Sequence, residues 1–265
     1  MSLSPAPFTL FAVVTALRSA GCVFAEDEAE LIVAAAADPA ALAAMVERRA
    51  AGHPLEHVLG WAGFDGLRIV VGPGVFVPRR RTEFLLHQAA ALARPGAVVV
   101  DLCCGSGALG AALAARLGPL ELHAADVEPA AVRYARRNLG GAGEVHRGDL
   151  FEPLPGTLRG RVEILLANVP YVPTGDVGLL PPEARIHEPR VALDGGPDGL
   201  DVLRRVAAEA PHWLAPGGHL LIETSERQAT RAEETLARHG LATRVVVSDE
   251  LYATVVVATR PGGLG

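Results

Sequence analysis

The chain is organised around Leu165-Leu166-Ala167-Asn168-Val169-Pro170-Tyr171, an apolar run that stops at an asparagine and continues into a proline and an aromatic residue. Its companion is Val98-Val99-Val100-Asp101-Leu102-Cys103-Cys104-Gly105-Ser106-Gly107, a second apolar run that enters a glycine turn. Continuous apolar runs are typical of strands buried on both faces of a parallel sheet. A glycine turn after such a strand allows a nucleotide-like ligand to approach the backbone. We therefore expect neighbouring strands, with Asn168 beside that ligand.

From Val98 onward, apolar runs alternate with helical stretches, which predicts a doubly wound α/β sheet. We expect strands at residues 97–102, 120–125, 143–147, 162–167, 217–223, 242–248 and 252–259. We expect helices at roughly 107–117, 128–138, 200–214 and 226–239. The connection around Asp249 is too short for a helical crossover, so the last two strands should pair antiparallel.

The N-terminal part of the chain has a different pattern. Residues 1–60 are rich in alanine with apolar residues at helical spacing, which predicts a small helical domain that is broken at Asp38-Pro39. Residues 61–80 predict a hairpin linker with a turn at Gly66. The main domain is then expected at residues 81–265.

Composition excludes several classes of protein. Half of the 265 residues are hydrophobic and the formal net charge is −6, which argues against sequence-blind binding to nucleic acid. The three cysteines, Cys22, Cys103 and Cys104, form neither a disulfide framework nor a Cys-x-x-Cys metal motif. The apolar N-terminal segment lacks the basic start of a signal peptide. We expect a cytoplasmic protein without a metal site or membrane association.

Polar residues that follow successive strands indicate a cofactor site at one edge of the sheet. Residues 105–110 match G-x-G-x-x-G, a pattern that suits a dinucleotide as well as other adenosyl ligands. Asp126 is placed to bind ribose hydroxyl groups. Its alternative role is to cap the helix that follows, and the two roles are compatible. Asp149 can accept a hydrogen bond from the amine of an adenine, with Leu150 packed against the ring. The alternative is that Asp149 is only a turn residue.

The segment Asn168 to Tyr171 favours methyl transfer over hydride transfer. An amide nitrogen is a poor nucleophile, so catalysis must come mainly from orientation toward a sulfonium methyl group. The Asn168 side-chain oxygen and the Val169 carbonyl can accept its two N–H groups, and Val169 is biased to extended geometry because it precedes Pro170. Tyr171 can form an aromatic wall. The expected cofactor is therefore S-adenosylmethionine. The alternative interpretation of the segment Asn168 to Tyr171 is an ordinary turn at the end of a strand.

With these residues, the chain resembles the protein-(glutamine-N5) methyltransferases that modify peptide-chain release factors, the HemK/PrmC type. The resemblance rests on Val77-Pro78-Arg79 with Thr82-Glu83, Asp101-Leu102-x-x-Gly105-x-Gly107, Asn168-Val169-Pro170-Tyr171, and Glu188-Pro189 followed by Asp194-Gly195-Gly196-x-Asp198-Gly199-Leu200. This chain departs from the family at Val169, which replaces a proline, and at Cys103 and Cys104, which replace a Gly-Thr pair.

The resemblance implies a class I S-adenosylmethionine-dependent methyltransferase: a Rossmann-like seven-stranded sheet, last strand antiparallel, behind a helical domain that seats the protein substrate. It implies catalytic roles for Asn168, Pro170 and Tyr171. Substrate contacts are expected at these residues, at Val169 and at Arg79, whose neighbourhood is either a solvated turn or a clamp. Cofactor contacts are expected at Asp101, Cys103, Cys104, Gly105, Ser106, Gly107, Asp126, Asp149, Leu150 and Asn168.

The expected function is N5-methylation of a glutamine in a protein, with a release factor as the substrate. The first alternative is an adenine-N6 nucleic-acid methyltransferase, which shares the Asn-Pro-Pro-Tyr motif but needs a basic channel. The second is a non-catalytic protein that binds S-adenosylmethionine, suggested by Val169. A nicotinamide-dependent oxidoreductase ranks last.

Overall fold

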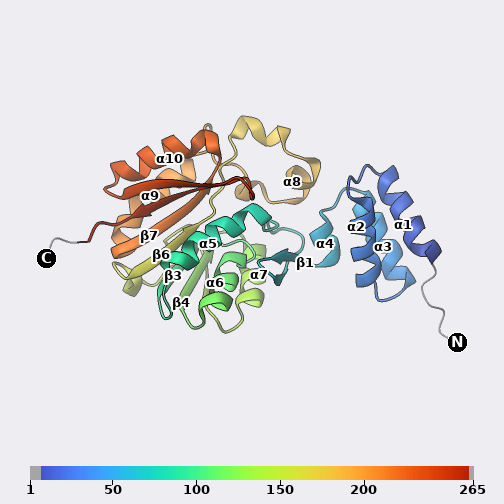
Figure 1. Cartoon of the computed structure of the whole chain (residues 1–265), viewed down its shortest axis with the longest axis horizontal. Helices are drawn as coiled ribbons and strands as arrows, with labels where there is room; N and C mark the ends of the chain where they lie inside the picture. The colour runs from blue at the N-terminus through green and yellow to red at the C-terminus, as the bar shows by residue number, and fades with distance from the viewer. Residues whose placement is uncertain (1–6, 263–265) are drawn as a thin grey trace.

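The computed structural model describes residues 7–262; the outer ends of the first and last expected domains, residues 1–6 and 263–265, lie outside the described residues. Four N-terminal helices stand to one side of the molecule (Figure 1). They are α1 (Pro7–Ser19), α2 (Ala25–Ala35), α3 (Pro39–Ala50) and α4 (Leu55–Leu59). Asp38 caps α3, because its carboxylate accepts a hydrogen bond from the Ala41 N–H at 2.8 Å. Leu17 and Ile32 are fully buried in a small core of these helices, which confirms the predicted helical region.

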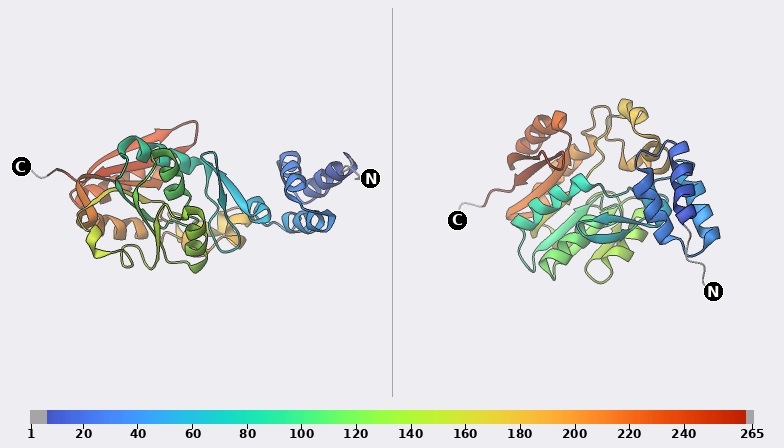
Figure 2. Two further views of the ribbon diagram at one scale, coloured as in Figure 1. Left: turned by 90° about the horizontal axis from the view of Figure 1, so that it is seen from below. Right: turned by 45° about the vertical axis from the view of Figure 1, so that its right-hand side comes forward.

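A β-hairpin connects the helices to the α/β body, as Figure 2 shows. Its strands are β1 (Trp61–Phe64) and β2 (Leu67–Val70), followed by the short helix η1 (Arg80–Thr82). Asp65 and Gly66 both have positive φ, 49° and 76°, as a tight two-residue hairpin turn requires. Phe64 and Ile69 are buried in the core of the α/β body, so the hairpin is anchored to that body. The division at residues 60 and 80 stays a prediction.

The main sheet has seven strands in the order β5-β4-β3-β6-β7-β9-β8. They are β3 (Val98–Leu102), β4 (Glu121–Asp126), β5 (Glu144–Arg147), β6 (Val162–Ala167), β7 (Leu214–Thr224), β8 (Ala242–Ser248) and β9 (Ala253–Thr259). The last strand, β9, pairs antiparallel with β7 on one side and β8 on the other, while β3 to β7 pair parallel. Both the strand positions and the antiparallel last strand confirm the sequence predictions.

Helices cover both faces of the sheet (Figure 1). One face carries α5 (Glu83–Leu92), α6 (Ala108–Leu117) and α7 (Pro129–Leu139), and the other carries α9 (Asp201–Trp213) and α10 (Glu226–Arg238). The central strand β3 is buried at all five positions, which explains its unbroken apolar sequence. The fold class is therefore α/β, as expected.

Two features of the connections position the site. Strand β3 lies between β4 and β6, so the strand order changes direction at β3. Open α/β sheets bind ligands at such a switch point. After β6 the chain makes a long excursion before α9. It consists of η3 (Thr174–Leu179), α8 (Pro182–His187), η4 (Arg190–Ala192) and the glycine-containing loop of residues 193–200.

A further short helix, η2 (Gly156–Leu158), lies between β5 and β6. Among residues 7–262, no helix has the length and apolar character that crossing a bilayer requires.

Candidate active site

The carboxyl ends of four neighbouring strands bring polar residues into one row. Leu102 of β3 pairs in register with Ala125 of β4 and Ala167 of β6, and Ala167 pairs with Ile222 of β7. The next residue on each strand is Asp126 on β4, Cys103 on β3, Asn168 on β6 and Glu223 on β7. Neighbouring strands are about 4.8 Å apart. The row therefore crosses the sheet edge as a band of functional groups.

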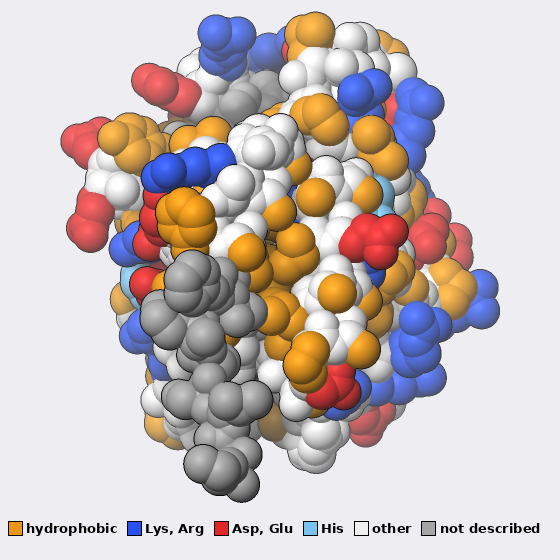
Figure 3. All heavy atoms as spheres, turned by 90° about the vertical axis from the view of Figure 1, so that its right-hand side faces the viewer, with side chains coloured by type: hydrophobic (Ala, Val, Ile, Leu, Met, Phe, Trp, Pro, Cys, Tyr) orange, Lys and Arg blue, Asp and Glu red, His pale blue; other side chains and the backbone are white. Residues whose placement is uncertain are grey.

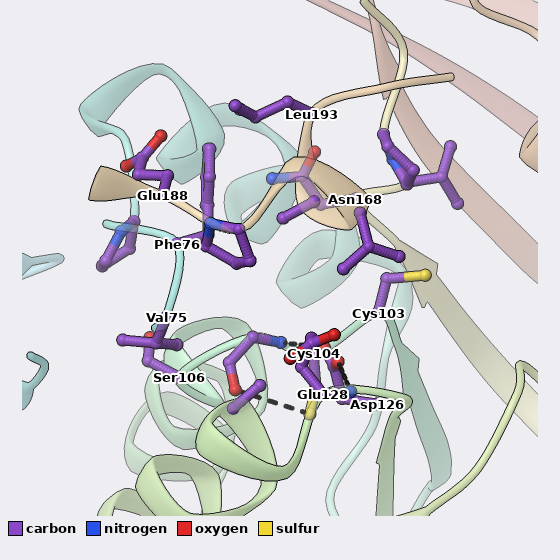
Figure 4. A pocket seen from close by; sticks show the side chains of 18 of the residues that line it. Val75, Phe76, Cys103, Cys104, Ser106, Asp126, Glu128, Asn168, Glu188 and Leu193 are labelled. Atoms are coloured by element: carbon purple, nitrogen blue, oxygen red, sulfur yellow. Dashed lines mark hydrogen bonds between the residues drawn. The ribbon is translucent and has the colours of Figure 1, made fainter. Parts of the chain in front are cut away.

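Three residues of this row, Asp126, Cys103 and Asn168, border a cavity of about 420 Å³, within the size range of small-ligand sites. Asn168 and Asp126 lie on opposite sides of it and Cys103 lies between them (Figure 4). Other linings include Arg79, Ser106, Leu150, Pro170 and Tyr171. The cavity collects most of the residues predicted to bind cofactor or substrate. Two predicted cofactor residues, Asp101 and Gly107, do not line it.

The glycine turn presents its backbone to the cavity at Gly105. Gly105 has a φ of 55°, and no atom lies within 4 Å of the position that a Cβ would occupy. Its N–H donates to Asp126 Oδ2 at 2.8 Å, while Asp126 Oδ1 accepts from the Glu128 N–H at 2.9 Å. Asp126 therefore orders the turn and the residue that precedes α7, whose N-cap is Glu128 and has no side-chain capping hydrogen bond. Burial raises the pKa of this carboxyl group.

Gly107 and Asp101 support the turn from behind. A Cβ at Gly107 would lie 2.5 Å from a Leu139 methyl group, so this glycine allows α6 to pack against α7. Asp101 is completely buried, and its Oδ2 accepts from the Gly110 N–H at 3.2 Å. Burial raises the pKa of Asp101 to about 7. Direct contact of either residue with cofactor stays a prediction.

The two cysteines of the turn differ in backbone geometry. Cys103 has a φ of 52°, a left-handed conformation that costs a non-glycine residue roughly 1 kcal/mol or more. A glycine at this position would avoid that cost. Cys104 is buried against the turn. Burial raises the pKa of both thiols, so both are protonated at neutral pH.

At the end of β5, Leu150 and Asp149 form another wall of the cavity. Leu150 has a φ of 49°, and this left-handed bend turns the chain around the cavity rim. Asp149 Oδ2 accepts a hydrogen bond from Arg205 Nη2 at 2.6 Å. The carboxylate is thereby fixed in place and retains capacity to accept a second donor. The predicted adenine contact stays a prediction.

Asn168 is held by the segment that precedes α5. Its Nδ2 lies 3.5 Å from Thr82 Oγ1, at the outer limit of a hydrogen bond, and Thr82 is buried. Within the described residues, the Asn168 side-chain oxygen makes no hydrogen bond. Val169 and Pro170, which follow it, are buried at the cavity wall. The geometry thus leaves one acceptor oxygen available beside the cavity.

The side chains of Tyr171, Arg81 and Glu223 form a closed network of three hydrogen bonds. Its hydroxyl donates to Glu223 Oε1 at 3.2 Å and accepts from Arg81 Nη2 at 2.5 Å, and Arg81 Nε donates to the same Glu223 oxygen at 3.1 Å. Burial and the neighbouring Glu223 carboxylate raise the pKa of Tyr171. The phenol is therefore a hydrogen-bond donor at neutral pH and not a base.

Arg79 lines the cavity, but its guanidinium group is paired within the protein. Arg79 Nη2 lies 2.6 Å from both carboxylate oxygens of Glu188, which also accepts from the Val77 N–H at 3.1 Å. Glu188 is buried, and an unpaired charge there would be costly. The pair attaches the linker to the excursion after β6. The substrate contact predicted for Arg79 stays a prediction.

The loop of residues 193–200 supports the backbone of the segment Pro170 to Val172. Val172 exchanges two backbone hydrogen bonds with this loop, to Leu193 and from Gly195. A Cβ at Gly195 would lie 2.6 Å from the Pro170 carbonyl oxygen, so no side chain fits there. Gln228 Nε2 donates to the Tyr171 carbonyl at 2.9 Å. The loop of residues 193–200, which includes one of the stretches that carry the resemblance, therefore packs behind the segment that follows Asn168.

Sequence reasoning missed three residues of the site: Arg81, Thr82 and Glu223. Glu223 follows an apolar run, Leu220-Leu221-Ile222, which is the signal that singled out Asp126 and Asn168. Thr82 belongs to a stretch that carries the resemblance and Arg81 to the run of arginines, but neither had a predicted site role, because their partners lie between 86 and 142 residues further along the chain.

The parallel sheet, the glycine turn and the row at the strand ends define a class I methyltransferase. Residues 66–179 match the family described as Methyltransferase small domain. A methyltransferase from Pyrococcus furiosus has the same fold, with a TM-score of 0.57 and 17% identity over 74% of this chain and 90% of that one.

Two curated relatives extend over most of the chain. A release factor glutamine methyltransferase of Mycolicibacterium smegmatis is 42% identical over 84% of this chain and 82% of its own length. One from Geobacter sulfurreducens is 38% identical over 84% of this chain and 78% of its own length. The chain belongs to the release factor glutamine methyltransferase family.

Proposed function

We propose that the protein transfers a methyl group from S-adenosylmethionine to the side-chain nitrogen of a glutamine in a peptide-chain release factor. The observation that carries the proposal is Asn168: a side-chain oxygen without a partner in the described residues, at the mouth of a strand-end cavity beside the glycine turn. The names of the relatives from M. smegmatis and G. sulfurreducens supply the substrate class.

The cavity has the donors, acceptors and space that the cofactor needs. The open Gly105 backbone admits close approach, the Asp126 and Asp149 carboxylates face the cavity for hydroxyl and amine groups, and Leu150 offers an apolar surface. The cofactor supplies an electrophilic methyl group on a sulfonium. Cys103, in the centre of the row, lies between the Asp126 end and the Asn168 end.

Asn168 and the backbone that follows it orient the nucleophile. The Asn168 oxygen accepts one N–H of the substrate amide and the Val169 carbonyl accepts the other, so that the nitrogen faces the methyl group. Tyr171, fixed by Glu223 and Arg81, holds the segment in place. Because its pKa is raised, Tyr171 does not take the proton that the nitrogen loses. That proton goes to solvent.

A protein substrate suits the surroundings of the cavity. Arg49 of α3 pairs with Glu183 of α8 at 2.7 Å, which brings the helical region beside the cavity mouth. The helical region exposes Phe11 and Phe24, and the excursion exposes Leu179 and Ile186. Figure 3, which faces the N-terminal end, shows hydrophobic side chains gathered at the centre and charged ones toward the edges. A release factor would place the reaction in the cytoplasm.

The test is transfer of labelled methyl groups to purified release factors from the same organism, with the modified residue mapped by mass spectrometry. We expect one methyl group on a glutamine, and loss of transfer in Asn168→Ala with retained cofactor binding. Label on adenine in DNA or RNA would support the first alternative. Binding of S-adenosylmethionine without transfer to any release factor would contradict the proposal.

A further inference from the structure

A cluster of two histidines and a glutamate lies between β4 and β5, outside the active-site cavity. His123 of β4 pairs in register with Glu144 of β5, and His146 follows two residues later, on the same face. β5 is the edge strand of the sheet, so one side of the cluster is open to solvent. His123 comes three residues before Asp126, about 10 Å along the strand. None of the three residues lines the cavity.

The three ligand atoms have the spacing of a metal site. His123 Nδ1 lies 3.1 Å from His146 Nε2 and 3.9 Å from Glu144 Oε2, and His146 Nε2 lies 3.8 Å from the same oxygen. A circle through three points at these separations has a radius of about 2.1 Å, which equals the Zn–N and Zn–O distances of proteins. A cation in the plane of the three atoms would lie at bonding distance from each, and a small closing movement of the exposed Glu144 side chain would give the tetrahedral arrangement.

Both imidazoles are largely shielded from solvent. The side chains of His123 and His146 are 9% and 17% exposed. A neutral imidazole has a free lone pair on one ring nitrogen. The Glu144 side chain is 72% exposed, so it can close on a cation that arrives from solvent.

A second carboxylate stands behind His123. Glu121 Oε1 lies 4.0 Å from His123 Nε2, on the opposite side of the ring from the cluster. Arg161 fixes Glu121 through two hydrogen bonds of 3.1 and 2.7 Å. A carboxylate behind a ligating histidine orients the ring and increases the basicity of the ligating nitrogen. The separation of 4.0 Å between Glu121 and His123 is longer than a hydrogen bond, so Glu121 acts on His123 through its charge, and Nδ1 is the ring nitrogen that faces His146 and Glu144.

We propose that His123, Glu144 and His146 bind a zinc ion that ties the edge strand β5 to β4. Two imidazole nitrogens and one carboxylate oxygen suit Zn²⁺, and a water molecule completes a tetrahedral shell on the open side. The site is structural and is independent of methyl transfer. It also revises the expectation from sequence that the chain has no metal site, because two strands bring together residues 123, 144 and 146 that form no sequence motif.

The test is calorimetric titration of the full-length, tag-free, metal-free protein with zinc chloride, followed by cobalt chloride with visible spectroscopy. We expect one Zn²⁺ per chain, a raised melting temperature, and tetrahedral Co²⁺ bands. His146→Asn should weaken binding at least as much as the roughly 10- to 100-fold that loss of a supporting group costs, and Glu144→Gln roughly tenfold. His239→Asn and Glu234→Gln are exposed controls and should bind as the wild type does.

Two results would overturn the proposal. One is the absence of stoichiometric Zn²⁺ binding to the wild-type protein, which would leave an ordinary histidine–histidine hydrogen bond. The other is binding that survives in His146→Asn but disappears in the double variant Cys103→Ser/Cys104→Ser, which would place the ion at the thiols. Because the readout is metal binding and thermal stability, neither result depends on methyltransferase activity.

Discussion

The hydroxyl of Tyr171 donates a hydrogen bond to Oε1 of Glu223 across 3.2 Å, and the two residues come from strand ends that neighbour each other in the sheet. Glu223 is 2% exposed, and its second oxygen has no partner among the described residues. Burial of the Glu223 carboxylate costs desolvation free energy, and its ion pair with Arg81 offsets that cost. The contact therefore fixes the segment after Asn168 to the rigid sheet.

The first prediction concerns this contact. Tyr171→Phe removes a hydrogen bond to a charged group, typically about 1.5 to 3 kcal/mol, so catalytic efficiency should fall roughly 10- to 100-fold. The cofactor Kd should change less than about twofold, because Tyr171 acts on the amide side of the cavity. Steady-state kinetics and calorimetry measure the two effects. Tyr252→Phe, at an exposed tyrosine, is the matched control. An equal loss of cofactor binding would show a general collapse of the site.

The second prediction tests the loop of residues 193–200, which packs behind the segment that follows Asn168. In Gly195→Ala the new Cβ would lie 2.6 Å from the Pro170 carbonyl oxygen, which must then move. We expect methyl transfer to fall at least tenfold, since misplacement of about 1 Å costs on the order of 100-fold. Gly175→Ala is the control, because nothing lies within 4 Å of its Cβ position. Unchanged transfer in Gly195→Ala would separate this loop from catalysis.

Local pattern was sufficient for the strands and for part of the site. Buried strands that end at Asp126 and Asn168 can be recognised from sequence because apolar runs and polar stops are local features. Glu223 has the same pattern, and it is the last residue of the strand expected at residues 217–223. Its role depends on the position of β7 next to β6, and strand order is a property of the whole sheet.

Pairings between distant segments could not be predicted. No sequence feature indicates that Arg79 pairs with Glu188, 109 residues away, and the substrate contact predicted for Arg79 is untested. Thr82 approaches Asn168 only because α5 packs on the sheet face next to β6. In the same way, the histidines of β4 and β5 become neighbours through strand register. These contacts follow from packing, which no sequence spacing encodes.

The third prediction concerns Asp126 and the cofactor. Asp126→Ala removes the acceptor for the Gly105 N–H and leaves that turn without its anchor. We expect the Kd for S-adenosylmethionine to rise about tenfold or more, as the loss of a charged hydrogen-bond partner implies. Calorimetry measures it, and Asp249→Ala at an exposed position is the control. Unchanged affinity would contradict the ribose assignment.

The fourth prediction is a pH dependence that originates at Asp101. Burial raises its pKa to about 7 in the native protein, against an ordinary value near 4 in the unfolded chain. Between these values the native state binds more protons than the unfolded state, so this group makes the protein less stable as pH rises.

Asp101→Asn removes that titration while an amide oxygen can still accept from the Gly110 N–H. The free energy of unfolding of Asp101→Asn relative to wild type should therefore increase from pH 4 to pH 7 and level off above, by at most about 4 kcal/mol. Urea unfolding at a series of pH values measures this difference, with Asp249→Asn as an exposed control. A difference that stays constant with pH, or that shrinks as pH rises, would show that Asp101 ionises in the native protein at least as easily as in water.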